Sequence, residues 1–245
     1  MSDQVVSGAP QGTPSVGMDP NIRELVANGD DNLVLAQRLG EWISHAPDLE
    51  LDIALGNIAL DHLGVARSLY THAAGLEGRG RTEDDFAMRR TKRDFVNLLL
   101  VEQPNGDFAH TIVRQVFFDV YQRELWKGLA SSEDETLAGI ASRATRENAY
   151  HLEFSSSWLT RLGDGTEESH LRTQSAVDDL WRFTAELSSE EWTRGIDVML
   201  AEATLEKPDD VYQRTGGRDG YHTEHLGHLL AEMQWMDRSY PEMTW

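Results

Sequence analysis

The sequence predicts an all-α protein built as a bundle of long helices, and three observations support this. Apolar residues recur along most of the 245-residue chain at intervals of three and four, which is the spacing of one helix face. Between Asn32 and Arg238 only Pro47, Pro104 and Pro208 interrupt the chain, each where the apolar pattern pauses. No stretch alternates between apolar and polar residues for long enough to predict a strand.

Residues 1–30 are expected to form a disordered or loosely ordered tail. They contain Pro10, Pro14 and Pro20 and few apolar side chains. Such a segment buries too little apolar surface to offset the entropy lost on ordering. The rest of the chain has a length that suits one large core, so we expect a single helical domain over 31–245.

The first strong helix signal runs from Asp48 to Ala74. Its apolar residues occupy two faces: Leu51, Leu55, Ile58, Val65 and Leu69 on one, and Ile53, Leu60 and Leu63 on the other. A helix that is apolar nearly all round is typical of the centre of a protein, so we expect this helix to be central. The polar stretch from Gly75 to about Thr91 is expected to cross the surface.

Further helices are expected over 107–130, 137–162, 166–187, 190–205 and 221–238. An N-cap signal at Asn105 to Asp107 precedes the first of them, and Gly163 follows the second as a stop signal. One long crossing in an otherwise short-looped bundle is the connectivity of a ferritin-like four-helix bundle. The sequence therefore predicts that fold, with additional C-terminal helices.

Composition narrows the functional classes. The absence of cysteine excludes disulfides, iron–sulfur clusters and thiolate zinc sites, so any metal would need His and carboxylate ligands. The net charge of −20 opposes binding to nucleic acid or anionic lipid, and serves either solubility or complementarity to a more basic partner. With no basic stretch followed by an apolar run and no long apolar window, we expect a cytoplasmic protein without a membrane partner.

A di-iron site in such a bundle needs one Glu from each of two helices and a Glu-x-x-His from each of the other two. On the predicted helix 137–162, helix angles place Glu147, Asn148 and His151 on or beside the apolar stripe. Glu147 and His151 are separated by one residue more than the motif requires. On the helix from Asp48, Asp61 is the best inward carboxylate, and we expect no histidine there in the required register.

Asp107 and His110 have the required spacing, but Asp107 sits in the first turn, where a carboxylate favours the role of N-cap. His110 is either a core histidine or a remnant ligand. A complete set of six ligands cannot be assembled, so we expect neither a di-iron site nor a catalytic residue in this chain. We interpret the inward polar residues as remnants of a degenerate di-iron site, held by internal hydrogen bonds: Asp61, His110, Glu147, Asn148 and His151.

Three histidines near the C-terminus resemble a ligand cluster at first sight. His222, His225 and His228 are spaced by three residues, which turns each about 60° from the previous one on a helix. We expect a surface cluster that captures metal only adventitiously.

Four stretches resemble a known family, the C subunits of bacterial ring 1,2-phenylacetyl-CoA epoxidases. They are Asp52–Asp61, Asn97–His110, Arg161–Ser169 and His222–Met233. The resemblance extends over roughly Asn32 to Arg238 and leaves out the N-terminal tail.

This resemblance implies a non-catalytic, structural subunit. In that family the partner A subunit holds the di-iron centre and the acyl-CoA. The complex also contains a small bridging subunit and a reductase with flavin and iron–sulfur groups. It is an NADPH- and dioxygen-dependent monooxygenase of phenylacetate catabolism. We therefore expect no cofactor in this chain, and self-association is left open.

Two other functions fit parts of the sequence. A self-sufficient ferritin-like di-iron carboxylate oxidase, or an iron store, would need the ligand set that is missing. A free-standing helical interaction protein would fit the composition and periodicity equally well, and only the long motifs argue against it.

Overall fold

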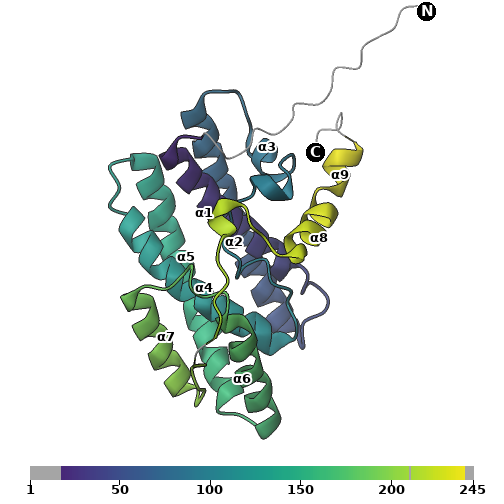
Figure 1. The fold of residues 1–245 in the computed structure, drawn as a ribbon, viewed down its shortest axis with the longest axis vertical. Coiled ribbons are helices and arrows are strands. Elements are labelled where there is room, and N and C mark those ends of the chain that lie inside the picture. Colours follow the sequence, from purple (N-terminus) through teal and green to yellow (C-terminus); the bar gives the residue numbers. More distant parts are fainter. Residues whose placement is uncertain (1–17, 210, 241–245) are drawn as a thin grey trace, which may run out of the picture.

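The computed structural model describes residues 18–209 and 211–240, and within them the chain is helical and contains no strand. Four long helices form a bundle (Figure 1): α1 (Pro20–Gly40), α2 (Leu49–Glu77), α4 (Phe108–Leu129) and α5 (Glu135–Gly163). Helix α1 packs along α2, α4 packs along α5, and α2 also contacts α5. This confirms the predicted all-α fold class, a ferritin-like four-helix bundle with additional C-terminal helices.

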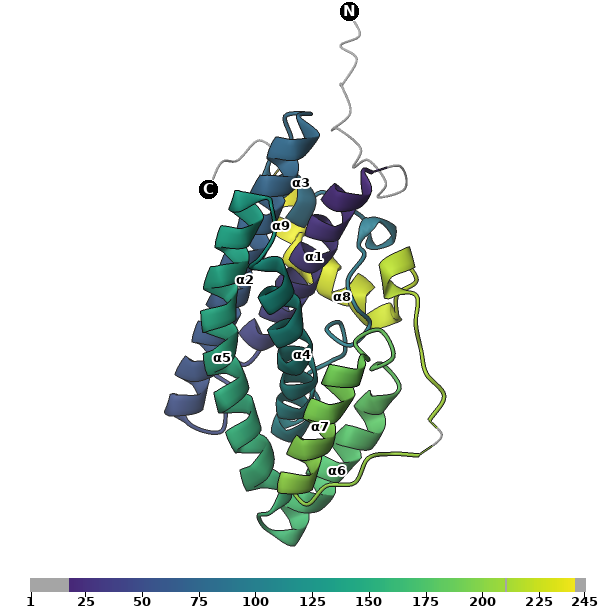
Figure 2. The ribbon, with the colours of Figure 1, turned by 90° about the vertical axis from the view of Figure 1, so that its left-hand side faces the viewer.

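The remaining helices lie on the outside of this bundle. Helices α6 (Glu167–Trp181) and α7 (Glu190–Glu202) pack against α4 and α5 at one end (Figure 2). The short helices α3 (Glu83–Ala87), α8 (Glu224–Met233) and α9 (Trp235–Ser239) lie toward the other end, beside α1 and α2. Among the described residues, none of the helices is both long and apolar enough to cross a membrane.

Side-chain caps fix where the long helices begin. Asp48 accepts a hydrogen bond from the backbone N–H of Leu51 at 2.8 Å and so starts α2. Asp107 does the same for the N–H of His110 at 3.0 Å at the start of α4, which confirms the predicted N-cap. Helix α2 ends at Gly78, whose φ of 65° suits glycine.

Helix α1 corrects the prediction of a loose tail. It begins at Pro20, after Asp19 has capped the N–H of Asn21, and most of its residues from Ile22 onward are buried. The prediction is therefore wrong for residues 20–30, whereas residues 1–17 lie outside the described residues. A single domain over 31–245 stays a prediction. Helix α1 begins at Pro20, before the predicted first residue of that domain.

Asp30 and Asp31 make the middle of α1 polar, and both are buried because their carboxylates have partners. Asp30 accepts hydrogen bonds from the Arg90 guanidinium and from the Tyr70 hydroxyl, the latter at 2.6 Å. Asp31 accepts from the Arg218 guanidinium at 2.6 Å and from the backbone N–H of Leu98 at 2.7 Å. A buried charge is tolerated when it is paired and hydrogen-bonded in this way.

The long connection between α2 and α4 lies only partly at the surface. Its first part, up to Thr91, is mostly exposed, as predicted for residues 75–91. Beyond it, all of residues 94–103 are buried, and none of them belongs to an α-helix. Carboxylates satisfy their backbone groups, since Glu186 accepts from the N–H of Leu99 at 2.8 Å. Buried Glu102 accepts from the N–H of Thr223 at 2.6 Å, which ties the C-terminal segment to this connection.

The second apolar face of α2 is not in the core, so the prediction of a central helix is wrong for that face. The face with Leu55 and Ile58 is fully buried, but Ile53 is 55% and Leu60 is 64% exposed. In a bundle of four helices each helix keeps an outer face, and none of the described elements covers this one.

Candidate functional site

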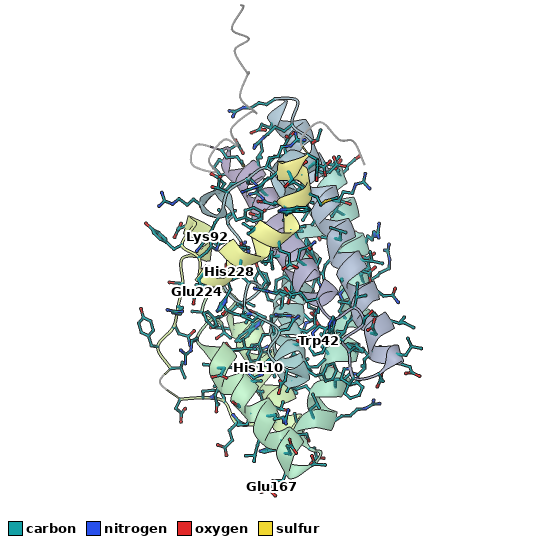
Figure 3. The ribbon with its side chains drawn as sticks, turned by 90° about the vertical axis from the view of Figure 1, so that its right-hand side faces the viewer. Trp42, Lys92, His110, Glu167, Glu224 and His228 are labelled. Atoms are coloured by element: carbon teal, nitrogen blue, oxygen red, sulfur yellow. The ribbon has the colours of Figure 1, made fainter. Side chains whose placement is uncertain are left out.

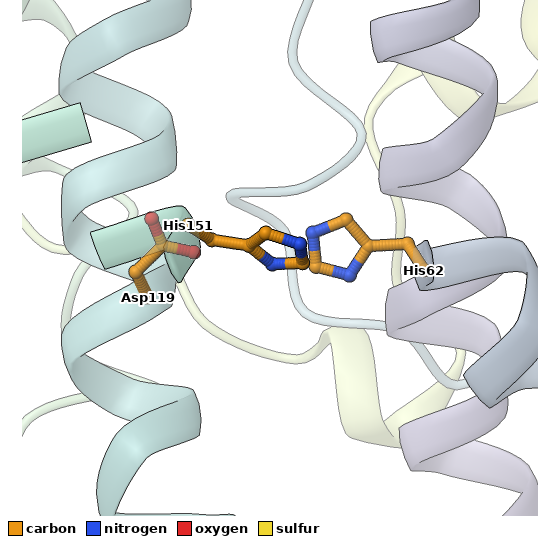
Figure 4. A group of neighbouring side chains, drawn as sticks. All are labelled: His62, Asp119 and His151. Atoms are coloured by element: carbon orange, nitrogen blue, oxygen red, sulfur yellow. The ribbon is translucent and has the colours of Figure 1, made fainter. Parts of the chain in front are cut away.

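Midway along the bundle, polar side chains from all four long helices meet in the interior. We call this group the central polar cluster: Asn32 from α1, His62 from α2, Gln115 and Asp119 from α4, and Asn148, His151 and Ser155 from α5. Each of these residues is at most 3% exposed. Figure 4 shows the rings of His62 and His151 turned toward each other next to Asp119, and the ring centroids lie 4.9 Å apart.

His62 is held as a neutral ring in one orientation. Its Nδ1 lies 2.8 Å from Oδ1 of Asn32, an acceptor, so Nδ1 carries the proton. The orientation of the Asn32 amide is fixed because its Nδ2 donates to the backbone oxygen of Asn28. Burial is the main cause that holds the pKa of His62 well below its ordinary value, and the nearby His151 lowers it further. The unprotonated Nε2 therefore faces the cluster interior.

Asp119 is the carboxylate at the middle of the cluster. Its Oδ1 accepts a hydrogen bond from Nε2 of Gln115 at 2.7 Å, and its Oδ2 accepts from the Ser155 hydroxyl at 2.7 Å. Burial raises the pKa of Asp119 to about 7, and these two hydrogen bonds oppose that shift. Near neutral pH the group is thus balanced between its neutral and charged forms.

His151 completes the cluster on the side of α5. Its Nε2 lies 3.1 Å from Oδ2 of Asp61, a half-buried carboxylate at the edge of the cluster. Burial lowers the pKa of His151, and the contact with Asp61 opposes this. Nδ1 of His151 and the amide oxygens of Gln115 and Asn148 have no hydrogen-bond partner among the described residues. The cluster is therefore polar but not fully satisfied.

The positions of these residues match the ligand pattern of a di-iron bundle, but their chemistry does not. Two of the helices carry the i, i+3 spacing of the motif, as Ala59-x-x-His62 and Asn148-x-x-His151. Alanine and asparagine thus stand where the motif has glutamate. The other two helices contribute the amides Asn32 and Gln115 beside His62. Within the described residues, Asp119 is the one carboxylate inside the cluster, which is too few to balance two irons.

A single ion does not fit either. His62, Asp119 and His151 offer three ligand atoms within 4.8 Å of one another, which makes them a candidate metal site. A zinc-like ion requires bonds of about 2.0–2.2 Å to all its ligands. However, the amide nitrogen of Gln115 lies 2.7 Å from Asp119 and 3.4 Å from Nε2 of His62. A hydrogen-bond donor thus lies between two of the three residues, where a cation would have to lie.

The structure gathers some of the predicted residues and separates others. Asn148 and His151 lie in the central polar cluster, and Asp61 lies at its edge. Glu147 lies beside the cluster rather than within it: its Oε1 accepts a hydrogen bond from the Arg143 guanidinium at 2.6 Å, its side chain is 18% exposed, and its charge opposes the lowering of the His151 pKa. His110 also lies apart, at the start of α4, where it contacts Asp107 and Asp179. Whether the cluster is a remnant of an ancestral metal site stays a prediction.

Sequence reasoning missed His62, Gln115, Asp119 and Asn32. The statement that the helix after Asp48 has no histidine in register is wrong, because His62 is buried at the centre. A signal was available, since His62 and His151 each follow a small or amide residue by three positions. Asn32 was missed because no helix was predicted for its segment, although that segment belongs to the predicted domain 31–245.

The C-terminal histidines do not form one cluster. His222 precedes α8 and its side chain is buried, with Nδ1 2.9 Å from Glu102 and Nε2 2.8 Å from the backbone oxygen of Phe95. It is thus inaccessible to a surface metal, contrary to the prediction. His225 and His228 lie on α8. Figure 3 labels His228 on α8, the helix that begins at Glu224.

Two known sequences or families are similar to this chain. The sequence matches the protein family described as "Phenylacetic acid catabolic protein" over residues 7–191 and 188–245. The C subunit of the 1,2-phenylacetyl-CoA epoxidase of Escherichia coli (strain K12) is 49% identical over 238 residues, covering 89% of this chain and 96% of the relative. The predicted resemblance is confirmed, and the family match begins at residue 7 rather than near Asn32.

Proposed function

The chain belongs to the phenylacetic acid catabolic protein family, and from this premise we propose that it is the structural C subunit of a 1,2-phenylacetyl-CoA epoxidase. The E. coli relative bears the name of that subunit, and the two sequences match over nearly their whole lengths. A likeness of this extent supports a shared role as well as a shared fold. We expect the chain to act in the cytoplasm.

One observation carries the non-catalytic part of the proposal. The interior positions that would need carboxylates to hold two irons are occupied by Asn32, Gln115 and Asn148, which bear no charge. Two ferrous ions in a buried site would leave positive charge that a single carboxylate, Asp119, cannot balance. A self-sufficient di-iron oxidase would require the missing carboxylates. The oxygen chemistry is therefore assigned to another subunit.

The proposal includes specific partners. A catalytic A subunit of related fold holds the di-iron centre and the acyl-CoA, and this chain supports that subunit without contributing a reacting atom. A small bridging subunit and a reductase with flavin and iron–sulfur groups complete the assembly. The name of the relative supports membership of a multi-subunit enzyme, and the sequence resemblance supports the identity of the partners.

Reconstitution of activity tests this function. The catalytic, bridging and reductase subunits would be purified separately and assayed with phenylacetyl-CoA, NADPH and dioxygen, with and without this chain. We expect epoxide formation only when this chain is present, and none from this chain with the reductase alone. Full activity in its absence, or turnover when the catalytic subunit is omitted, would overturn the proposal.

A further inference from the structure

The outer face of α2 carries large apolar side chains that no described part of the chain covers. Leu49 is 70%, Ile53 55%, Leu60 64% and Leu63 40% exposed. With Gly56 they follow one another at steps of four, three, four and three residues. We call these five residues the α2 stripe. This is the heptad spacing of a helix that packs along another helix.

Gly56 leaves an indentation in the α2 stripe. A Cβ atom at Gly56 would meet no heavy atom within 4 Å. A glycine in a row of leucine and isoleucine leaves a hole, and a hole of this kind accepts a side chain from a facing helix. The stripe spans fifteen residues, from Leu49 to Leu63, or about 21 Å of helix.

The α2 stripe continues into a groove. Leu63 also lines a cavity of about 720 Å³ between α2, α3 and the C-terminal helices. Met88, Met233 and Met236 contribute to its wall. Methionine side chains are flexible and apolar, and they adapt to the shape of a bound partner. The stripe thus adjoins a groove whose wall combines these apolar residues with charged ones: Arg67, Glu83, Asp84, Arg89 and Asp237.

Two exposed apolar residues on other helices occur singly and need no such explanation. Leu171 on α6 is 61% exposed and Val198 on α7 is 53% exposed, which is close to the exposure of Leu60 and Ile53. Neither belongs to a row of heptad-spaced apolar residues. They are therefore suitable controls for the α2 stripe.

Charge indicates what kind of chain covers the stripe. From Leu49 to Ala66, α2 carries Glu50, Asp52 and Asp61 but no Lys or Arg, and the next residue, Arg67, lines the groove and pairs with Glu83 at 3.2 Å. The chain as a whole has a net charge of −20, so a second copy would bring like charge against like charge. A helix from a different chain, with basic residues beside its apolar face, is complementary in both respects.

We propose that the α2 stripe and the adjoining groove bind an amphipathic helix of the catalytic partner subunit, with Lys or Arg flanking the apolar face of that helix. This proposal rests on the proposed function and adds to it the surface through which the two subunits meet. It accounts for the second apolar face of α2, which the fold of this chain alone leaves without a role.

The binding test compares two double variants of the full-length chain. Ile53→Asp/Leu60→Asp alters the α2 stripe, and Leu171→Asp/Val198→Asp alters equally exposed helical positions elsewhere. Calorimetric titration into the purified catalytic subunit measures Kd, and circular dichroism checks folding. We expect Kd to rise about 100-fold or more for the stripe variant and to stay within about threefold for the control.

A second pair of variants does not depend on how an introduced charge is tolerated. Gly56→Leu fills the hole of the stripe while favouring the helix, and Gly139→Leu does the same at an open position of α5. We expect the first, but not the second, to weaken binding by at least about tenfold. Equal binding by wild type and both stripe variants overturns the inference.

Two further outcomes separate the inference from the function on which it rests. If the wild-type chain does not bind the catalytic subunit at all, the proposed function fails and the inference fails with it. If wild type forms a homodimer that Gly56→Leu disrupts, while binding to the catalytic subunit is unchanged, the stripe is covered by a second copy. That result overturns the inference and leaves the proposed function intact.

Discussion

Nε2 of Gln115 donates a hydrogen bond to Oδ1 of Asp119 at 2.7 Å, one turn further along α4. An amide at this position supplies a hydrogen-bond donor where a glutamate would supply a negative charge. The central polar cluster consequently holds one ionisable carboxylate among neutral groups, and it has no surplus of negative charge that would attract a cation. The stability of the bundle therefore depends on keeping its interior close to neutral.

Gln115→Glu places a second carboxylate beside Asp119. We expect it to lower the free energy of unfolding by about 3 kcal/mol or more at pH 8, because two buried like charges lack a counter-ion. The loss should be smaller at pH 5, where protonation neutralises the pair. Urea denaturation at both pH values measures this. Gln115→Met, of similar size and uncharged, is the control, and equal losses for the two variants at pH 8 would contradict the prediction.

Asp119→Asn changes how stability depends on pH. Burial raises the pKa of Asp119 from 3.8 to about 7, so the folded protein keeps a proton that the unfolded chain releases. The stability from this group is present below about pH 4 and is lost as the pH rises to about 7, a change of roughly 4 kcal/mol. Relative to wild type, Asp119→Asn should therefore gain stability over that range.

Urea denaturation from pH 4 to pH 8 measures this gain. The control is Asp178→Asn, which alters an exposed carboxylate of α6. Parallel stability curves for wild type and Asp119→Asn would show that the buried carboxylate does not hold its proton in the folded protein.

Asp30→Ala removes the partner of a fully buried cation. Arg90 is 1% exposed, and Asp30 also accepts hydrogen bonds from Tyr70 and from the N–H of Val96. We expect the variant to lose about 3–5 kcal/mol of unfolding free energy, since an unpaired guanidinium remains in the core. Glu168→Ala, which breaks an exposed pair with Arg172, should cost less than about 1 kcal/mol. Comparable losses for the two variants would argue against this account.

Gly217→Ala tests the close packing of the C-terminal segment. A Cβ at this position would lie 2.3 Å from the backbone oxygen of Asn97, a contact that backbone must move to relieve. We expect faster hydrogen exchange in residues 211–223, measured by mass spectrometry. Gly139→Ala, at an open position of α5, should instead gain about 0.5–1 kcal/mol. Unchanged exchange in the Gly217→Ala variant would show that the segment is held by other contacts.

The helices of the bundle were predictable where burial follows a single periodic face. The starts at Asp48 and Asp107 and the stop near Gly163 were read correctly, because capping and periodicity are local signals. Helix α1 was missed because its buried Asp30 and Asp31 are polar. Their partners lie about 60 and 187 residues away in the sequence, and no local pattern indicates them.

The site was only partly predictable for a related reason. Helix angles placed Asn148 and His151 inward correctly, but Glu147 lies near the boundary between the two faces. Its Oε1 pairs with Arg143, four residues earlier, and its side chain stays mostly buried. The outer face of α2 was assigned to the core because apolarity alone does not distinguish a core face from a surface that binds another subunit.

Iron content tests the central claim most directly. The isolated chain would be incubated with excess ferrous iron without oxygen, desalted and measured for iron by mass spectrometry, with the catalytic subunit treated in parallel as a positive control. We expect far less than one iron per chain. Two irons per chain, or one ion whose binding is lost in His62→Ala, would contradict it.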